Sequence, residues 1–380
     1  MRSETIKITE SLDQIDPDEW NQLVPVNSPT LSFQFLNALE KSGCVSEKTG
    51  WKPRHVTLHN QNGIVAAVPC YLKFHSWGEF IFDWAWANAY DQAGLTYYPK
   101  LLIAVPFTPI TGSRLLVQPN QNRIALQKQL TDAVSLLAEE EAVSSVHWLF
   151  TTENETTQLT QAGLLPRVSN QFHWNNAGYA SFADFLSALN AKKRKNILRE
   201  RRRVRDTGIH FSWRTGHEAT PTDWQHFYHC YHRTIDDHGS ITYLNLDFFL
   251  QLAETIPSNV RLLLAEQGGI PIAAAFFLCT NDALYGRYWG TVRPIPDLHF
   301  ETCYYQPIEY CVTHGLDRFE AGAQGEHKLS RGLMPNTIHS AHWLRHPDFY
   351  DAIARYTEEE AEHVKRYMNM LERHSPFRKV

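Results

Sequence analysis

Several features that place a protein in a membrane or outside the cell are missing from this chain of 380 residues. No run of about 18 or more apolar residues occurs, so we expect no segment that spans a membrane. The opening residues, Met1 to Lys7, lack the apolar core of a signal peptide. The six cysteines show no C-x-x-C spacing, which argues against structural disulfides and a cysteine-based zinc site. These absences predict a reduced protein of the cytoplasm.

Motifs for covalent catalysis and for phosphate binding are missing as well. The sequence holds no G-x-S-x-G, no P-loop and no G-x-G-x-x-G after a predicted strand. The histidine groups at 226–232 and 339–346 lack the carboxylates and the spacing of known zinc patterns, so we expect structural histidines and predict no metal site. Because no nucleophile is paired with a base, we expect any group transfer to proceed by direct attack.

Charge is distributed unevenly along the chain, whose formal net charge is −5. Between Lys192 and Arg205, nine Lys or Arg stand against Glu200 alone, a local charge of +8 that leaves −13 for the rest. A run this one-sided cannot pair with itself, so it favours a focused anionic partner over a merely solvated helix face. We assign this role to Lys192, Lys193, Arg194, Lys195, Arg199, Arg201 and Arg202.

The hydrophobic patterns predict two halves with a similar order of elements. In the first half we expect helices at 33–42 and 122–141, and strands at 55–58, 64–74, 79–86 and 145–150. In the second half we expect helices at 181–205, 223–233, 246–256 and 301–314, and strands at 260–267, 271–280, 283–291 and 317–321. The pair Gly268-Gly269 suits the positive φ angles of a hairpin turn between two of these strands.

Polar and aromatic residues concentrate between Leu284 and Arg331. Strand alternation predicts that Tyr285, Arg287 and Trp289 share one face and that Tyr288 lies on the other, which would line a ligand wall with cation–π support. The cations after the last strand can hold a phosphate or carboxylate. The predicted donor- or substrate-binding residues are Tyr285, Arg287, Tyr288, Trp289, Gln324, Lys328 and Arg331.

Four residues of the same stretch are candidates for proton transfer: His299, Glu301, Glu326 and His327. A histidine with a near-neutral pKa and a partly buried glutamate both suit removal of a proton from an amine. The alternatives are that His299 and Glu301 only cap and charge a helix N-terminus, and that Glu326 and His327 lie in a solvated loop. Asp297 is either a helix N-cap or part of the site.

Five segments of the chain resemble one known family. They are Tyr97–Gly112, Lys192–Val204, Leu284–Gly290, Leu298–Gln306 and Gly322–Lys328. They resemble the FemAB-like branch of the GNAT (acyl-CoA N-acyltransferase) superfamily, described as peptidoglycan biosynthesis/recognition, over nearly the whole chain. The second half is similar to a GNAT domain in its order of helix, helix, three antiparallel strands, helix and strand. The sequence R-P-I-P-D at 293–297 departs from the glycine-rich pyrophosphate loop of such domains, which counts against ordinary coenzyme A binding.

The resemblance implies a fold, a reaction and partners. It implies an α/β (α+β) protein of two GNAT-like domains, 1–170 and 171–380, each a mixed, mostly antiparallel sheet flanked by helices. The reaction would be N-acyl transfer to an amine of a small molecule or peptide, with acyl-CoA or aminoacyl-tRNA as co-substrate and no tightly bound cofactor. The basic helix would bind tRNA, and backbone N–H groups near Tyr288–Gly290 would hold the oxyanion. The alternative is a non-catalytic protein of the bacterial cytoplasm that recognises cell-wall or peptide fragments.

Overall fold

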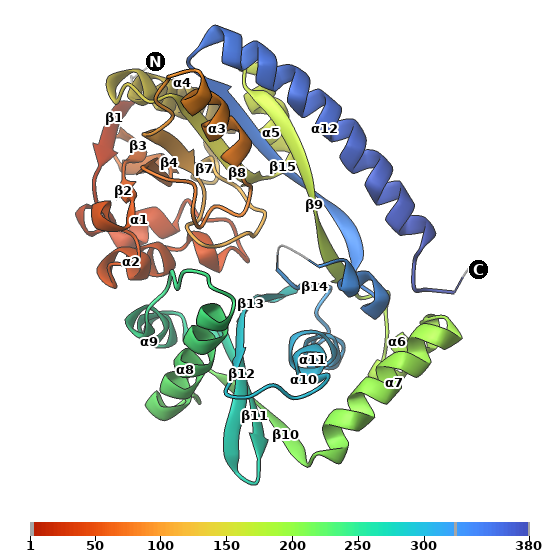
Figure 1. Cartoon of the computed structure of the whole chain (residues 1–380). Helices are drawn as coiled ribbons and strands as arrows, with labels where there is room; N and C mark the ends of the chain where they lie inside the picture. Colours follow the sequence, from red (N-terminus) through yellow and green to blue (C-terminus); the bar gives the residue numbers. More distant parts are fainter. Residues whose placement is uncertain (1–3, 323–324, 379–380) are drawn as a thin grey trace. The chain divides into compact units, whose positions relative to one another are not determined.

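The computed structural model describes residues 4–322 and 325–378, which form two compact units (Figure 1). Unit 1 comprises the chain up to Ser169 together with Thr337–Arg366. Unit 2 comprises Asn170–Asn336 and the chain from Tyr367 onward. The sequence prediction placed a single boundary between residues 170 and 171, whereas in the structure the chain also returns to unit 1 after Asn336.

Unit 1 contains two sets of paired strands. One is ordered β1-β3-β4-β7 and is antiparallel; in the other, β15, β8, β6, β5 and β2 follow one another, with only the β6–β8 pair parallel. The strands are β1 Thr5–Thr9, β2 Trp51–Pro53, β3 His55–Asn60, β4 Gly63–Val68, β5 Cys70–Lys73, β6 Lys100–Ile103, β7 Leu116–Val117, β8 Ser145–Thr151 and, from Thr337 onward, β15 Met334–Leu344. The helices are α1 Pro17–Asn21, α2 Phe33–Lys41, α3 Trp84–Gln92, α4 Arg123–Glu140, α5 Glu153–Gln161 and, up to Arg366, α12 Pro347–Arg373.

Two predictions for unit 1 need correction. The expected strand at 64–74 is two strands, β4 and β5, separated at Pro69, which has no N–H to donate to a ladder. The expected strand at 79–86 is wrong, because helix α3 begins at Trp84. Trp86 and Tyr90 are buried four residues apart and so lie on one helical face, a spacing that the high β propensity of aromatic residues obscured.

Unit 2 is built on strands in the order β10-β11-β12-β13-β14-β9, in which β13 and β14 are the one parallel pair. These are β10 Ile209–Thr215, β11 Val260–Gln267, β12 Ile270–Cys279, β13 Ala283–Thr291, β14 Arg318–Glu320 and β9 Leu165–Asn175. The helices are α6 Phe182–Ala188, α7 Ala191–Asp206, α8 Pro221–Asp237, α9 Leu246–Thr255, α10 Leu298–Phe300, the π-helix η5 Glu301–Tyr305, α11 Gln306–His314 and the 3-10 helix η6 Glu326–Arg331. The hairpin at Gly268-Gly269 is confirmed, with φ of 60° and 76°.

Helices cover both faces of this sheet. Figure 1 shows α8 and α9 on one side of β12 and β13, and α10 and α11 on the other. The expected single helix at 181–205 is two helices, because Leu189 is extended and the Asn190 side chain accepts the backbone N–H of Lys193, 3.0 Å away, to begin α7. Within the described ranges, no helix is long and apolar enough to cross a membrane.

The predicted alternation along β13 is wrong, because the strand contains a β-bulge. Phe276 faces Tyr288 and Phe277 faces Gly286, so Arg287 has no opposite residue on β12. One extra residue reverses the order of faces beyond it. Trp289 therefore points to the opposite face of the sheet from Tyr285, toward α10.

Candidate active site

The candidate site begins where β13 separates from β14. The two strands pair only from Ala283 to Tyr285, while β13 continues to Thr291. The chain then passes through 292–297 into α10 and directly into the π-helix η5. π-Helical turns are rare and occur frequently at functional sites. Here the turn places His299 and Tyr304 beside the diverging end of β13.

Four side chains meet at this point, and we call them the imidazole cluster: Trp289, His299, Tyr304 and His327. The rings of Trp289 and His299 are 4.9 Å apart, and those of His299 and Tyr304 are 5.5 Å apart, both edge-to-face. The Tyr304 hydroxyl lies 2.8 Å from Nε2 of His327, within hydrogen-bond distance. The structure therefore brings together two of the predicted proton-transfer residues, His299 and His327, although 28 positions separate them in the sequence.

Both imidazoles of the cluster favour the neutral form. Burial, with a contribution from His327, lowers the pKa of His299 to about 4. Burial, together with Arg331 and Lys328, also lowers the pKa of His327. Burial raises the pKa of Tyr304, so its hydroxyl stays protonated. In the tautomer in which Nε2–H of His327 donates to the Tyr304 oxygen, Nδ1 keeps its lone pair. A neutral imidazole can accept a proton, which is the property that a general base requires.

Two further features describe what the cluster offers a ligand. The indole Nε1 of Trp289 is buried and has no hydrogen-bond partner among the described residues. A buried N–H without a partner costs about 1–3 kcal/mol, and it would suit a ligand oxygen. Burial raises the pKa of the neighbouring Cys303 thiol, so this sulfur stays protonated and is a poor nucleophile. The cluster thus has the groups for proton transfer and lacks a thiolate.

The structure separates Glu301 and Glu326 from the imidazole cluster. Both carboxylate oxygens of Glu301 accept from Nε of Arg201, at 3.1 and 3.2 Å, and Gln306 donates to the same group at 2.8 Å. Glu301 is therefore half of a buried ion pair. Glu326 is exposed and accepts a hydrogen bond from the Tyr367 hydroxyl. Asp297 stands at the N-cap position of α10, but its side chain makes no capping hydrogen bond, and its carboxylate accepts from Arg203 at 3.2 Å.

Lys328 and Arg331 are buried beside His327, and both donate hydrogen bonds to other parts of unit 2. Nζ of Lys328 donates to the Gly322 carbonyl at 2.9 Å, and burial lowers the pKa of this amine to about 8. Arg331 donates to the His327 carbonyl at 2.9 Å and to the Glu200 carboxylate at 3.1 Å. Its guanidinium also lies 3.4 Å from the centre of the Phe300 ring. These contacts fix the position of His327. Gln324, the neighbouring candidate, lies outside the described residues.

Of the four candidates on β13, Trp289 is the one that belongs to the imidazole cluster, through its ring contact with His299. The Tyr285 hydroxyl accepts from Arg318 at 2.7 Å, and the Tyr288 ring packs against Tyr231 of α8 at 4.8 Å. The Arg287 guanidinium lies 5.2 Å from the centre of the Tyr288 ring. The predicted wall of aromatic residues around Arg287 is therefore divided between the two faces of the sheet by the bulge.

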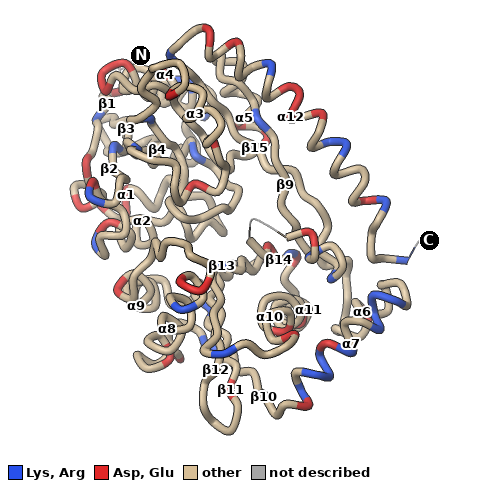
Figure 2. Tube along the Cα trace, in the orientation of Figure 1, with Lys and Arg blue, Asp and Glu red and all other residues tan. Residues whose placement is uncertain are grey.

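Lys and Arg residues gather along helix α7 (Figure 2), and the side-chain contacts divide the helix into two different faces. On one face Lys193 donates to Ser330 at 2.8 Å, Glu200 accepts from Arg331 and from the Tyr305 hydroxyl, and Arg201 pairs with Glu301. The other face is exposed. Its cations include Lys192, Lys195, Arg199 and Arg202, which follow one another at spacings of three or four residues and form one stripe. We call these four residues the α7 stripe. Of the predicted anion-binding set, Lys193 and Arg201 face inward instead.

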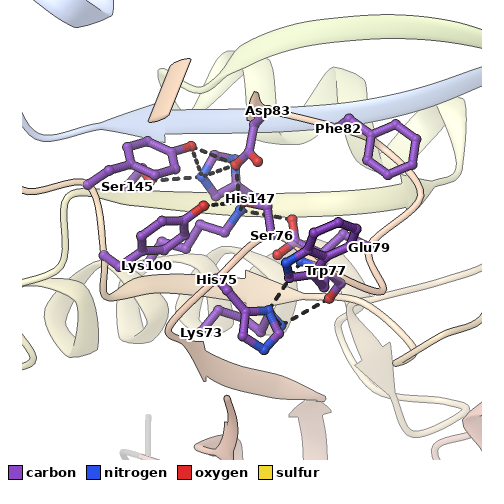
Figure 3. A network of polar contacts seen from close by, with 12 residues as sticks. Lys73, His75, Ser76, Trp77, Glu79, Phe82, Asp83, Lys100, Ser145 and His147 are labelled. Atoms are coloured by element: carbon purple, nitrogen blue, oxygen red, sulfur yellow. Dashed lines mark hydrogen bonds and ion pairs between the residues drawn. The ribbon is translucent and has the colours of Figure 1, made fainter. Parts of the chain in front are cut away.

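Unit 1 contains a buried charge network that the sequence analysis did not assign to a site (Figure 3). Nζ of Lys100 donates to Ser76 and to Glu79, each at 2.8 Å, and to Asp83. The Tyr97 hydroxyl donates to Asp83 at 2.6 Å. Burial opposes the charge on Lys100, but Asp83 and Glu79 outweigh it and raise its pKa. Lys100 lies in Tyr97–Gly112, one of the segments that resemble the family. Its side chain is 0% exposed and is part of a buried ion pair.

One sequence feature could have indicated this network. Lys73 and Lys100 stand at the ends of runs that are otherwise apolar, V-P-C-Y-L-K and L-L-I-A-V, and a lysine in such a run needs buried partners. Burial lowers the pKa of Lys73 to about 7, and its ammonium group lies 3.8 Å from the centre of the Trp51 ring. The partners themselves are spread along the chain, so the sequence could not identify them.

Comparisons with known proteins agree on the family and the fold. The FemAB-like family model, described as peptidoglycan biosynthesis/recognition, matches residues 11–379. No curated protein matches the chain. Among solved structures, FemX is 10% identical, with 92% of this chain and 100% of that chain covered and a TM-score of 0.54. The DUF2156 domain of a putative lysylphosphatidylglycerol synthetase from Agrobacterium fabrum is also 10% identical, with 90% and 95% covered and a TM-score of 0.54.

A tandem GNAT protein from the clavulanic acid biosynthesis pathway matches at 10% identity, with 90% of this chain and 99% of that chain covered and a TM-score of 0.48. At these identities the structural likenesses concern the fold. The predicted class, an α/β protein with two GNAT-like domains of mostly antiparallel sheet flanked by helices, is confirmed. Within residues 4–322 and 325–378, no group of histidine, cysteine, aspartate and glutamate side chains is arranged to hold a metal ion.

Proposed function

The chain belongs to the FemAB-like family, described as peptidoglycan biosynthesis/recognition, and from that premise we propose that it moves an acyl or aminoacyl group from an activated donor to an amine. The observation that carries this proposal is the imidazole cluster at the diverging end of β13. It combines two neutral imidazoles, a protonated tyrosine and an unpartnered indole N–H in one place. This set of groups suits proton transfer around a carbonyl group under attack.

His327 is the proposed general base. This residue is exposed, so an amine can approach it, and its lowered pKa keeps it unprotonated near neutral pH. The amine nitrogen attacks the donor carbonyl carbon and gives up a proton to Nδ1 of the imidazole. The bond from that carbon to the leaving oxygen or sulfur then breaks, and the Tyr304 hydroxyl gives its proton to the leaving atom. Tyr304 takes a proton back from Nε2–H of the His327 imidazolium, so both side chains end neutral.

The proposed reaction needs no covalent enzyme intermediate. Burial raises the pKa of the Cys303 thiol beside the cluster, which keeps the sulfur protonated. The developing oxyanion needs hydrogen-bond donors, and we propose the Trp289 Nε1–H for this role together with backbone N–H groups near Tyr288–Gly290. Glu301 is not proposed as a base, because its carboxylate is bound by Arg201 and Gln306.

Aminoacyl-tRNA is the donor that we favour over acyl-CoA. The α7 stripe is an exposed row of cations on the helix whose other face holds the loop of His327. Such a row suits a phosphate backbone, which binds cations without reading sequence. The loop at 292–297 has no glycine, and the Asp297 carboxylate is close to where a pyrophosphate would bind in a GNAT domain. Both features disfavour coenzyme A.

A non-catalytic recognition protein is the second candidate. The observation in its favour is that Lys328 and Arg331, the cations nearest to the cluster, are committed to internal hydrogen bonds. A protein that only binds cell-wall or peptide fragments needs the aromatic surface of the cluster and no turnover. Chemistry therefore has to be measured separately from binding.

The test is a transfer assay with charged tRNA and, separately, acetyl-CoA as donor, and a panel of peptides carrying lysine as acceptor. We expect transfer from charged tRNA by the wild type and a loss of about 10²–10⁴-fold in His327→Asn, because the general base is removed. Glu326→Gln is the matched control, since Glu326 is exposed and contacts Tyr367. Donor binding without transfer to any amine would support the recognition protein instead.

A further inference from the structure

The segment from Phe74 to Trp84, which joins β5 to α3, buries its carboxylates and exposes aromatic side chains. Its ionisable groups Glu79 and Asp83 are each 3% exposed. Three of its aromatic side chains, Phe74, Trp77 and Phe82, are 41%, 46% and 43% exposed, while Phe80 and Trp84 are half-buried. In a surface loop the charges are ordinarily hydrated and the aromatic rings buried, so both halves of this arrangement cost free energy. A reversal of this kind marks an interaction surface.

Lys100 binds the buried side of this segment. Three of its hydrogen bonds go to this one segment, at Ser76, Glu79 and Asp83. Lys73 donates to the Trp77 carbonyl at 3.2 Å, so the backbone beside the exposed indole is also held. Figure 3 shows Glu79 and Asp83 turned toward Lys100, while Phe82 lies apart from the network at the edge of the view. The charges are therefore withdrawn from the surface, and the loop is fixed before any partner arrives.

The exposed rings belong to one segment without an exposed charge. Trp77 and Trp84 are in edge-to-face contact, with ring centres 4.9 Å apart. Burial lowers the pKa of the nearby His75, which favours its neutral form. No side chain between Phe74 and Trp84 therefore presents a full charge to solvent. We call Phe74, Trp77, Phe82 and Trp84 the aromatic rim.

We propose that the aromatic rim inserts into the interfacial region of a lipid bilayer and holds unit 1 at a membrane surface. Tryptophan and phenylalanine favour the boundary between headgroups and acyl chains, and a loop that enters this region must carry no unpaired charge. The withdrawn carboxylates satisfy that condition. A sugar site would instead expose carboxylates to bind hydroxyl groups, and here Glu79 and Asp83 are committed to Lys100. The proposal does not depend on the transfer reaction.

The test is co-sedimentation of the full chain with phosphatidylcholine vesicles. We expect binding that survives high salt, because it rests on apolar burial and not on charge. Replacing Trp77 and Phe82 together by serine should weaken binding by about tenfold per ring, the effect of losing part of each ring's burial. Ile124→Ser is the matched control, since Ile124 is 76% exposed on α4 and lies outside the rim. This variant should bind as the wild type does.

A second variant separates insertion from loss of folding. Trp77→Phe keeps an aromatic ring, so it should co-sediment nearly as the wild type does but show less quenching of tryptophan fluorescence by brominated lipid. Three results would overturn the proposal: no binding to phosphatidylcholine, binding only to anionic vesicles with release by salt, or equal binding by the serine variant. Binding of N-acetylglucosamine oligomers that Trp77→Ser abolishes, without vesicle binding, would assign the rim to a sugar instead.

Discussion

The network around Lys100 in unit 1 and the imidazole cluster in unit 2 treat the protons of their titratable groups in opposite ways. In the network the charges are paired with one another: Lys100 has acceptors at Ser76, Glu79 and Asp83. In the imidazole cluster the groups are neutral, and His327 is exposed. A buried ion pair resists change of protonation because either charge alone is costly. A neutral imidazole near solvent accepts a proton readily.

The difference indicates which cluster performs chemistry. The network around Lys100 fixes the shape of a loop, while the cluster around His327 offers a base, a donor hydroxyl and a free N–H. Strongly shifted pKa values occur in both units, so a shift alone does not identify an active site. Access and the protonation state distinguish the two clusters.

The largest effect on stability is expected from Lys100→Met. The change leaves Glu79 and Asp83 buried without their cation, which should lower the free energy of unfolding by about 3–5 kcal/mol. Urea unfolding followed by circular dichroism measures this. Lys128→Met is the matched control, because Lys128 pairs with Asp132 on the surface and its loss should cost less than about 1 kcal/mol. Equal costs for the two variants would show that the ion pairs of Lys100 resist loss of a partner no more than a surface pair does, and would contradict the account of this network.

A smaller effect, on the transfer rate, is expected from Glu200→Gln. This variant tests whether the contacts of Arg331 hold His327 in place. Glu200 is the acceptor for Arg331 and the Tyr305 hydroxyl, and Arg331 in turn donates to the His327 carbonyl. Loss of its charge should reduce the transfer rate by about tenfold, because His327 is held less well. Donor affinity should change little. A variant that loses donor affinity and keeps its rate would show that Glu200 does not act through His327.

The smallest effect per residue is expected at the α7 stripe. Arg199→Ala and Arg202→Ala should each weaken tRNA binding and reduce the slope of log affinity against log salt by about one. Their free energy of unfolding should stay the same. Arg201→Ala on the inner face is the contrast, since it leaves Glu301 buried without its cation and should destabilise the protein. A salt slope unchanged by both outer variants would move the anion site elsewhere.

The regular elements of the chain could be predicted from local patterns. The helix expected at 122–141 and the hairpin at Gly268-Gly269 were confirmed, since both depend on residues close together in sequence. The strand expected at 79–86 failed because a tryptophan-rich stretch has high β propensity, while the buried pair Trp86 and Tyr90 needs a helix. The long helix α12 was not predicted at all, although it spans Pro347–Arg373.

The sites were harder to predict than the elements. His299 and His327 were predicted from their chemistry. Both contact Tyr304, and this arrangement depends on a π-helical turn that no sequence pattern predicted. The bulge at Arg287 moved Trp289 to the opposite face from Tyr285, and a bulge is set by pairing with β12. The partners of Lys100 lie 17 to 24 residues away in the sequence, so their convergence is a result of tertiary structure.

The pH dependence of the single-turnover transfer rate tests the central claim most directly. The pKa of His327 is lowered, so the unprotonated base persists below the ordinary range of histidine and the rate should be constant near neutral pH. It should fall as the pH drops through that lowered pKa, because the imidazole becomes protonated. We predict this acid limb in the wild type and its loss in His327→Asn, with donor binding unchanged. A His327→Asn variant that keeps both the full rate and the acid limb would contradict the account.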